Sequence, residues 1–159
     1  MKKFLLLFLI SGVLLLAGTT AQAQYKNALG VRVGKANGIT YKTFIQQNKA
    51  LDFILNFEDD NKNDRSFFRL TGLYEVHNPI NDLPGLRWYY GAGATIGNVN
   101  YKYNDNSDFL FSVDGVLGLD YKFSDAPINL ALDWKPALVF SPYSKFDEKG
   151  LGLSVRITF

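Results

Sequence analysis

The chain has 159 residues, with 17 Lys and Arg, 15 Asp and Glu, one His and no Cys. This length suits one domain. The nearly balanced charge lacks the basic excess that nucleic-acid binding needs, so no nucleic-acid partner is expected. Without Cys, an exported domain has no disulfides to stabilise it. Its stability must come from another source, of which a closed β-barrel is one.

The first 23 residues have the pattern of a secretory signal peptide. Two lysines precede an apolar run over residues 4–16, and the small residues Ala21 and Ala23 form an A-x-A cleavage site. We predict residues 1–23 as a signal peptide cleaved after Ala23, and residues 24–159 as the mature domain. The alternative, an uncleaved membrane anchor, needs a longer apolar run. Loss of the two lysines leaves 15 basic residues against 15 acidic ones, a formally neutral domain.

After this segment, apolar and polar residues alternate with a period of two, which is typical of β-strands with one polar face. No second long apolar run and no convincing helical period are present. In chain order the pattern predicts eight strands, at about residues 27–34, 39–46, 51–58, 66–76, 87–97, 109–123, 128–136 and 150–159.

The connections between these strands alternate in character. Asn37-Gly38 predicts a tight turn after the first strand, and polar loops follow the third, fifth and seventh strands at residues 59–65, 98–108 and 141–149. The connection at residues 77–85 is rich in Pro, Asn and Gly and begins with His77, which we expect to be solvated. Longer loops at one end and shorter turns at the other are typical of outer-membrane barrels with both termini in the periplasm.

The two faces of the predicted strands differ in charge. One face is apolar and has no charged residue, whereas the other has six positive and six negative side chains together with several glycines. An eight-stranded barrel is filled by its inward side chains, and buried charges must be paired. We therefore predict a structural ion network in the lumen, formed by Arg32, Lys42, Asp52, Glu58, Arg69, Glu75, Asp114, Asp120, Lys122, Asp133, Lys135 and Arg156.

Two soluble folds are the alternatives to a membrane barrel. A soluble barrel of the lipocalin kind turns its apolar face inward, and a β-sandwich buries that face between two sheets. Aromatic residues near the predicted strand ends favour a membrane, because such rings suit its two interfaces; they are Trp88, Tyr90, Tyr121, Phe123 and Trp134. The strands also approach the length that a tilted membrane strand needs. The predicted fold is therefore all-β, an eight-stranded antiparallel up-and-down transmembrane β-barrel.

The chain ends on GLSVRITF, in which Val155, Ile157 and Phe159 share the apolar face. With the predicted signal peptide, the strand pattern and the segment LGLDYKF…PINLALDWKPALVF (117–140), this ending resembles the small outer-membrane β-barrel proteins of Gram-negative envelopes. These are the eight-stranded OmpX/OmpA-type and porin-like barrel domains. The resemblance implies that Val155, Ile157 and Phe159 are an assembly signal for the barrel-assembly machinery. It also implies a location in the cell outer membrane, in contact with outer-membrane lipid and lipopolysaccharide.

No catalytic, metal or cofactor site is predicted. A lipid-modifying outer-membrane enzyme would need a Ser and a His held together, but Ser144 and Glu148 are placed at the opposite end from His77. The acidic segment 59–64 lacks the ligand spacing of an EF-hand. We predict a non-enzymatic, monomeric protein with a structural or surface-interaction role. A small porin-like channel and a lipid-modifying enzyme are the alternatives.

Two finer expectations concern single contacts. Arg156 is expected to point inward, towards a carboxylate such as Asp133. Aromatic residues in the predicted outer loops belong to an interface girdle or contact an unknown surface ligand; they are Tyr101, Tyr103, Tyr143 and Phe146.

Overall fold

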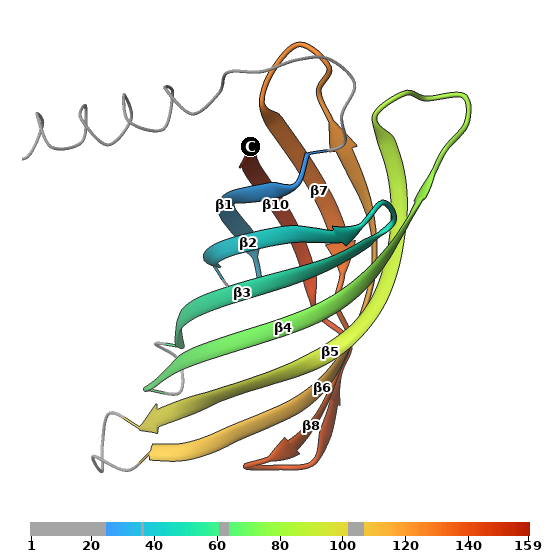
Figure 1. Cartoon of the computed structure of the whole chain (residues 1–159). Helices are drawn as coiled ribbons and strands as arrows, with labels where there is room; N and C mark the ends of the chain where they lie inside the picture. Colours follow the sequence, from blue (N-terminus) through green and yellow to red (C-terminus); the bar gives the residue numbers. More distant parts are fainter. Residues whose placement is uncertain (1–24, 36, 61–63, 102–106) are drawn as a thin grey trace, which may run out of the picture.

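A computed structural model describes residues 25–35, 37–60, 64–101 and 107–159. These residues form a single curved sheet (Figure 1). Its strands are β1 (Asn27–Gly34), β2 (Asn37–Gln46), β3 (Lys49–Asp60), β4 (Arg65–Pro79), β5 (Leu86–Tyr101), β6 (Ser107–Lys122), β7 (Ile128–Trp134), β8 (Ala137–Ser141), β9 (Lys145–Asp147) and β10 (Leu151–Thr158). No helix among these residues is long and apolar enough to cross a membrane.

The sheet closes on itself as a barrel of eight antiparallel strands, which confirms the predicted fold class. Strands β1 to β6 pair in chain order, β7 pairs with β6 and β10, and β10 pairs with β1 to complete the circle. Strand β8 continues the line of β7 beside β6, and β9 pairs with β8. At the closing seam Asn27 and Phe159 each donate a backbone hydrogen bond to the other, both at 2.9 Å.

The seventh predicted strand, over residues 128–136, corresponds to β7, which ends two residues earlier, and a separate strand continues its line. Strand β7 stops at Trp134 and β8 begins at Ala137. Pro136 lies in this gap and has no backbone N–H, which makes it a poor residue for a ladder with neighbours on both sides. Its carbonyl still accepts a bond from the Gly115 amide at 2.9 Å. Past this point the wall continues through β8 and the three-residue β9, which lies in the segment expected to be a loop.

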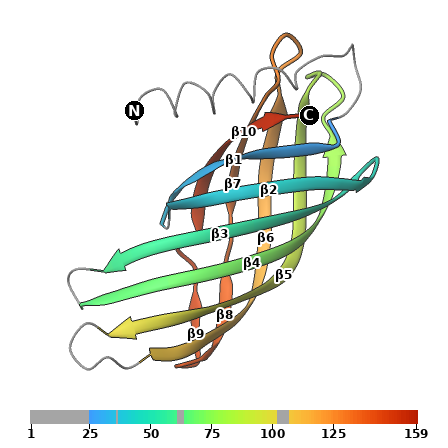
Figure 2. The same cartoon turned by 60° about the vertical axis from the view of Figure 1, so that its left-hand side comes forward.

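The two ends of the barrel differ (Figures 1 and 2). One end, called here the terminal end, holds the first residue of β1, the chain terminus and the short connections at residues 47–48, 80–85 and 123–127. The other, the loop end, holds the last residues of β1, β3, β5 and β8, whereas the segments at residues 135–136 and 148–150 face each other within the wall. Strands β3 to β6 have 12 to 16 residues, whereas β1 and β10 have 8 each. The long strands therefore extend further at the loop end than their neighbours do.

Side chains alternate between the inside and the outside of the barrel. Many large apolar residues lie on the outside. The following are 41–55% exposed: Leu29, Val31, Ile39, Phe53, Leu70, Tyr74, Leu117, Leu132, Leu153, Val155 and Ile157. The buried side faces the lumen, the space inside the barrel, where charged and polar residues surround a small apolar cluster of Ile54, Leu73, Tyr89, Val116 and Ala131. The apolar belt outside is far larger than the patches that soluble monomers expose.

Candidate functional site in the lumen

Lys42 is the centre of a buried ionic cluster in the terminal half of the lumen. Its Nζ lies 2.7 Å from Oε2 of Glu75, 3.6 Å from Oδ2 of Asp52 and 3.8 Å from Oδ2 of Asp120. These side chains come from β2, β4, β3 and β6, and all are 1% exposed or less. The same Nζ lies 4.3 Å from the centre of the Tyr89 ring. Residues on four strands thus converge on one ammonium group.

Arg156 of β10 extends into the same cluster. Its Nη2 donates to Oδ2 of Asp52 at 2.7 Å, its Nε to Oγ1 of Thr40 at 3.1 Å and its Nη1 to Oδ1 of Asn129 at 3.3 Å. The prediction that Arg156 contacts Asp133 is therefore wrong. In the β10–β7 register Arg156 is opposite Asn129, and Asp133 is four residues further along, opposite Gly152.

Asp133 instead binds Arg32 of β1. The guanidinium makes two bonds to the carboxylate, 2.7 Å from Nη1 to Oδ2 and 2.5 Å from Nη2 to Oδ1. The Tyr89 hydroxyl donates to the same carboxylate at 2.8 Å. Arg32 lies across Gly152, where any Cβ would collide with the guanidinium. Bidentate pairs of this kind are the geometrically specific ones, and the glycine makes room for this pair.

His77 is buried, which contradicts the expectation of a solvated connector residue. It is 1% exposed. Its Nε2 lies 2.9 Å from Oε2 of Glu75, and its ring stacks on Tyr89 at 4.8 Å and packs against Phe44 at 4.9 Å. The expectation failed because β4 continues to Pro79, where its partner β5 still provides a ladder. A proline is tolerated at such a strand end.

The loop half of the lumen has a second polar cluster around Asp114 of β6. The Thr95 hydroxyl donates to Oδ2 of Asp114, and the Ser112 hydroxyl donates to Oδ1 at 3.1 Å. Thr71 and Thr95 share a hydrogen bond of 2.7 Å. Lys135 Nζ lies 3.4 Å from Oδ1 of Asp114, which is long for an ammonium–carboxylate bond.

The remaining charged residues of the predicted network are nearer the two ends. Nη1 of Arg69 lies 3.0 Å from Oε2 of Glu58, and the two side chains are 22% and 25% exposed. Lys122 donates to the carbonyls of Phe123 and Ala126, at 2.5 and 2.8 Å. Eleven of the twelve residues thus lie within 4.0 Å of an opposite charge, and Lys122 contacts carbonyl oxygens. Sequence reasoning missed the neutral members, above all Tyr25, Thr40, Tyr89 and Asn129, because the selection was by charge.

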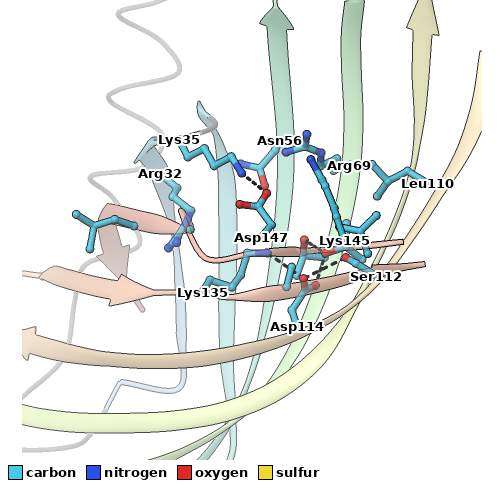
Figure 3. Close-up of a pocket in the computed structure, with 16 residues that line it drawn as sticks. Arg32, Lys35, Asn56, Arg69, Leu110, Ser112, Asp114, Lys135, Lys145 and Asp147 are labelled. Atoms are coloured by element: carbon cyan, nitrogen blue, oxygen red, sulfur yellow. Dashed lines mark hydrogen bonds and ion pairs between the residues drawn. The ribbon is translucent and has the colours of Figure 1, made fainter. Parts of the chain in front are cut away.

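A cavity of about 90 Å³ lies between the Asp114 cluster and the loop end (Figure 3). Basic side chains from several strands line it, together with Asp114 and Asp147. Lys35, next to the end of β1, forms an ion pair with Asp147 of β9 across its rim. Partial burial acts to raise the pKa of Asp147, but hydrogen bonds from Lys35 and from the Lys149 amide outweigh it and hold that pKa below its ordinary value.

The other predicted groups lie on the outside or beyond the described residues. Val155, Ile157 and Phe159 are 42%, 42% and 51% exposed on the outer face. The signal peptide with its cleavage residues Ala21 and Ala23, and the loop residue Tyr103, lie outside the described residues. Within the described part of the chain, no three His, Asp or Glu residues are placed to hold a metal ion.

No family model matches the sequence, and no curated protein matches it. Among solved structures, the N-terminal β-barrel domain of Pseudomonas aeruginosa OprF matches with a TM-score of 0.68 and 16% identity, over 87% of this chain and 100% of that one. Neisserial surface protein A (NspA) matches with a TM-score of 0.59 and 12% identity, over 84% of this chain and 93% of that one. The fold is that of the small outer-membrane barrels. At these identities the likeness concerns the fold.

Proposed function

We propose that this protein is an integral outer-membrane β-barrel with a structural or surface-interaction role and a lumen closed by its ionic network. The observation that carries the proposal is the combination of an apolar outer belt with an interior in which most charged side chains are buried and paired with an opposite charge. In water this arrangement is unfavourable, because the exterior would be one large exposed apolar patch. In a lipid bilayer it is favourable, because a closed barrel pairs the hydrogen-bonding groups of its backbone within the wall.

In this proposal the terminal end lies in the periplasm and the loop end lies outside the cell. Outer-membrane barrels extend further on the outer side than on the periplasmic side. Here the connections at the two ends have similar lengths, so the expected difference in loop length is not observed, but the long strands β3 to β6 extend the wall at the loop end beyond β1 and β10. Trp88 and Tyr90 stack on the outer surface near the terminal end, with 5.5 Å between ring centres. Such rings are typical of a membrane interface. The long strands β3 to β6 then hold loops for contacts at the cell surface.

The closed lumen distinguishes this proposal from a porin-like channel. Lys42, Asp52, Glu75, Asp120 and Arg156 are 0–1% exposed and extend into the lumen from five strands. These contacts argue against an aqueous path along the barrel axis, since an eight-stranded barrel has room inside only for packed side chains. The buried His77 also contacts no serine in the described contacts, which gives no support to a His-dependent lipid-modifying enzyme.

Two measurements test the proposal. Fractionation should recover the protein with outer membranes after a carbonate wash, and an unboiled sample should migrate differently from a boiled one on a gel. Release by carbonate would contradict the membrane placement. In planar bilayers the folded protein should give no reproducible conductance steps, with heat-unfolded protein at the same concentration as the control for non-specific leakage. Reproducible open steps from the folded sample alone would refute the closed lumen.

A further inference from the structure

The cavity in the loop half of the lumen is lined by more positive than negative side chains. Among the described residues, five basic side chains line it, namely Arg32, Lys35, Arg69, Lys135 and Lys145, and two acidic ones do, Asp114 and Asp147. The carboxylates that pair with Arg32 and Arg69 belong to Asp133 and Glu58, which do not line the cavity. We propose that this cavity binds a phosphate-class anion, held by Arg69, Lys135 and Lys145.

Lys145 is an exposed residue of β9 whose ammonium group forms no ion pair with another described residue, whereas Arg32, Lys35, Arg69 and Lys135 each have a carboxylate partner. A longer-range attraction links Lys145 to Asp147, two residues along the same strand. In Figure 3 its side chain extends along the cavity towards Arg69. Like charges brought together at the edge of a low-dielectric interior repel one another. An anion between them removes that repulsion and gains two attractive contacts.

The donors suit an anion with several oxygens. Lys135 is only loosely held by Asp114, at 3.4 Å, and its ammonium group has further protons to donate. The Arg69 guanidinium uses one contact, at 3.0 Å, on Glu58 and has other N–H groups available. A cavity of about 90 Å³ has room for several water molecules, and therefore for one phosphate group. Phosphate, with its tetrahedral oxygens, can accept from all three residues at once.

The cavity also has a route of entry through the rim. Strand β9 pairs with β8 and with no other described strand, and β3 continues to Asp60 although its pairing with β2 ends at Phe57. Strand pairing is thus interrupted between β3 and β9. The ion pair between Lys35 and Asp147 lies at this interruption. A free phosphate from outside and the phosphate headgroup of a membrane lipid present the same chemistry here, so the experiment must separate the two sources.

The test follows ³¹P NMR signals during titration of the folded protein in alkyl glycoside micelles. One arm adds inorganic phosphate at constant ionic strength, with chloride as the balancing anion. The second arm adds phosphatidic acid diluted into the same micelles. Because diacylglycerol has no phosphorus signal, a parallel series compares the thermal unfolding of the protein with phosphatidic acid and with diacylglycerol of the same chains, which is the neutral control. Binding in the first arm identifies a free anion as ligand, and binding in the second arm alone identifies a lipid headgroup.

Two charge reversals show whether the cavity is the site. Lys145→Glu should weaken binding of whichever ligand is active by at least about tenfold, since an attraction becomes a repulsion of similar size. Lys149→Glu is the matched control, an exposed lysine four residues further along that does not line the cavity. Its effect should stay below about threefold in 0.15 M salt, where distant charges are screened.

Binding of neither ligand would overturn the inference, as would equal losses in the two variants or an unchanged affinity in Lys145→Glu. Both substitutions are at exposed positions, so heat-modifiable migration should remain normal and verifies folding of each sample. This site is independent of the proposed membrane role. Failure of phosphate binding would leave membrane insertion and the closed lumen, which have their own assays, unaffected.

Discussion

The pair Arg156–Asp52 gives a quantitative test of the buried network. Arg156→Met removes one of the two cations beside Asp52, Glu75 and Asp120 and leaves Lys42 alone to compensate three buried carboxylates. All of these side chains are 0–1% exposed. Breaking a buried pair by removing one partner costs about 3–5 kcal/mol. We therefore expect the free energy of unfolding to fall by about that amount.

The double variant Arg156→Met with Asp52→Leu should recover part of this loss. Wild type and double variant have the same net charge in the cluster, because one cation and one anion leave together. Replacing both members of a buried pair by apolar groups is often close to neutral. Three hydrogen bonds are still lost, at about 1 kcal/mol each: the bond that Thr40 donates to Asp52, and the bonds that Arg156 donates to Thr40 and Asn129. We expect a coupling energy between the two sites of at least about 2 kcal/mol.

Urea unfolding in lipid vesicles, followed by the fluorescence of Trp88 and Trp134, measures these free energies. Lys122→Met is the control, because this lysine contacts carbonyls rather than carboxylates, and it should cost about 1 kcal/mol. Strictly additive losses in the double variant would refute the pairing. A loss in Arg156→Met no larger than that in Lys122→Met would show that the cluster is too well hydrated for the burial argument to apply.

Three further predictions concern the wall of the barrel. Gly118→Ala should destabilise the fold by about 1–3 kcal/mol, because the added Cβ would lie 2.6 Å from Cβ of Asp133. Gly115→Ala is the control and should be tolerated, since its Cβ would make only an ordinary 3.6 Å contact with Pro136. Equal stabilities of the two variants in urea unfolding would contradict this. Leu132→Arg on the outer face should cost about 2–4 kcal/mol in vesicles if that face meets lipid, and an unchanged unfolding midpoint would count against the membrane placement. Phe159→Asp should lower the amount of folded protein in the outer membrane more than it changes stability after refolding in vitro, as measured by heat-modifiable migration; normal levels in cells would count against an assembly signal.

The alternation of side chains made the wall predictable from sequence. A barrel strand has one face in the lumen and one outside, so charges such as Asp52 and Arg156 had to share the inner side wherever a strand was recognised. Recognition needed only the local pattern. The eight-stranded closed fold followed because the strand count and the two-sided chemistry agreed.

Strand ends were less predictable because a partner decides them. β4 passes Asn78 and stops at Pro79, since β5 offers a ladder up to that point. This is why His77 lies in the lumen and not in a turn. Pro136, where the wall is interrupted, was visible in the sequence. The local pattern could not show that this strand lies between two partners, β6 and β10, so that its missing N–H interrupts the ladder.

Contacts across the lumen were beyond sequence reasoning. Which carboxylate meets Arg156 depends on strand tilt and on the register of every pair around the circle, and no local feature encodes that sum. The choice of Asp133 was reasonable by adjacency, since β7 and β10 are neighbours. The observed partner, Asp52, comes from β3, which is not hydrogen-bonded to β10.

The two halves of the lumen should respond differently to substitution. In the terminal half the charged side chains of the Lys42 cluster and their partners are buried, so substitutions there act on folding. In the loop half, Lys145 is exposed and Arg69 is 22% exposed, so changes there cost little stability and act on what the cavity admits. The bidentate pair of Arg32 with Asp133 lies between the halves, because Arg32 lines the cavity while Asp133 also accepts from the buried Tyr89. Substitution of Arg32 should therefore lower both stability and anion binding, whereas Arg156 and Lys145 should each affect one property alone.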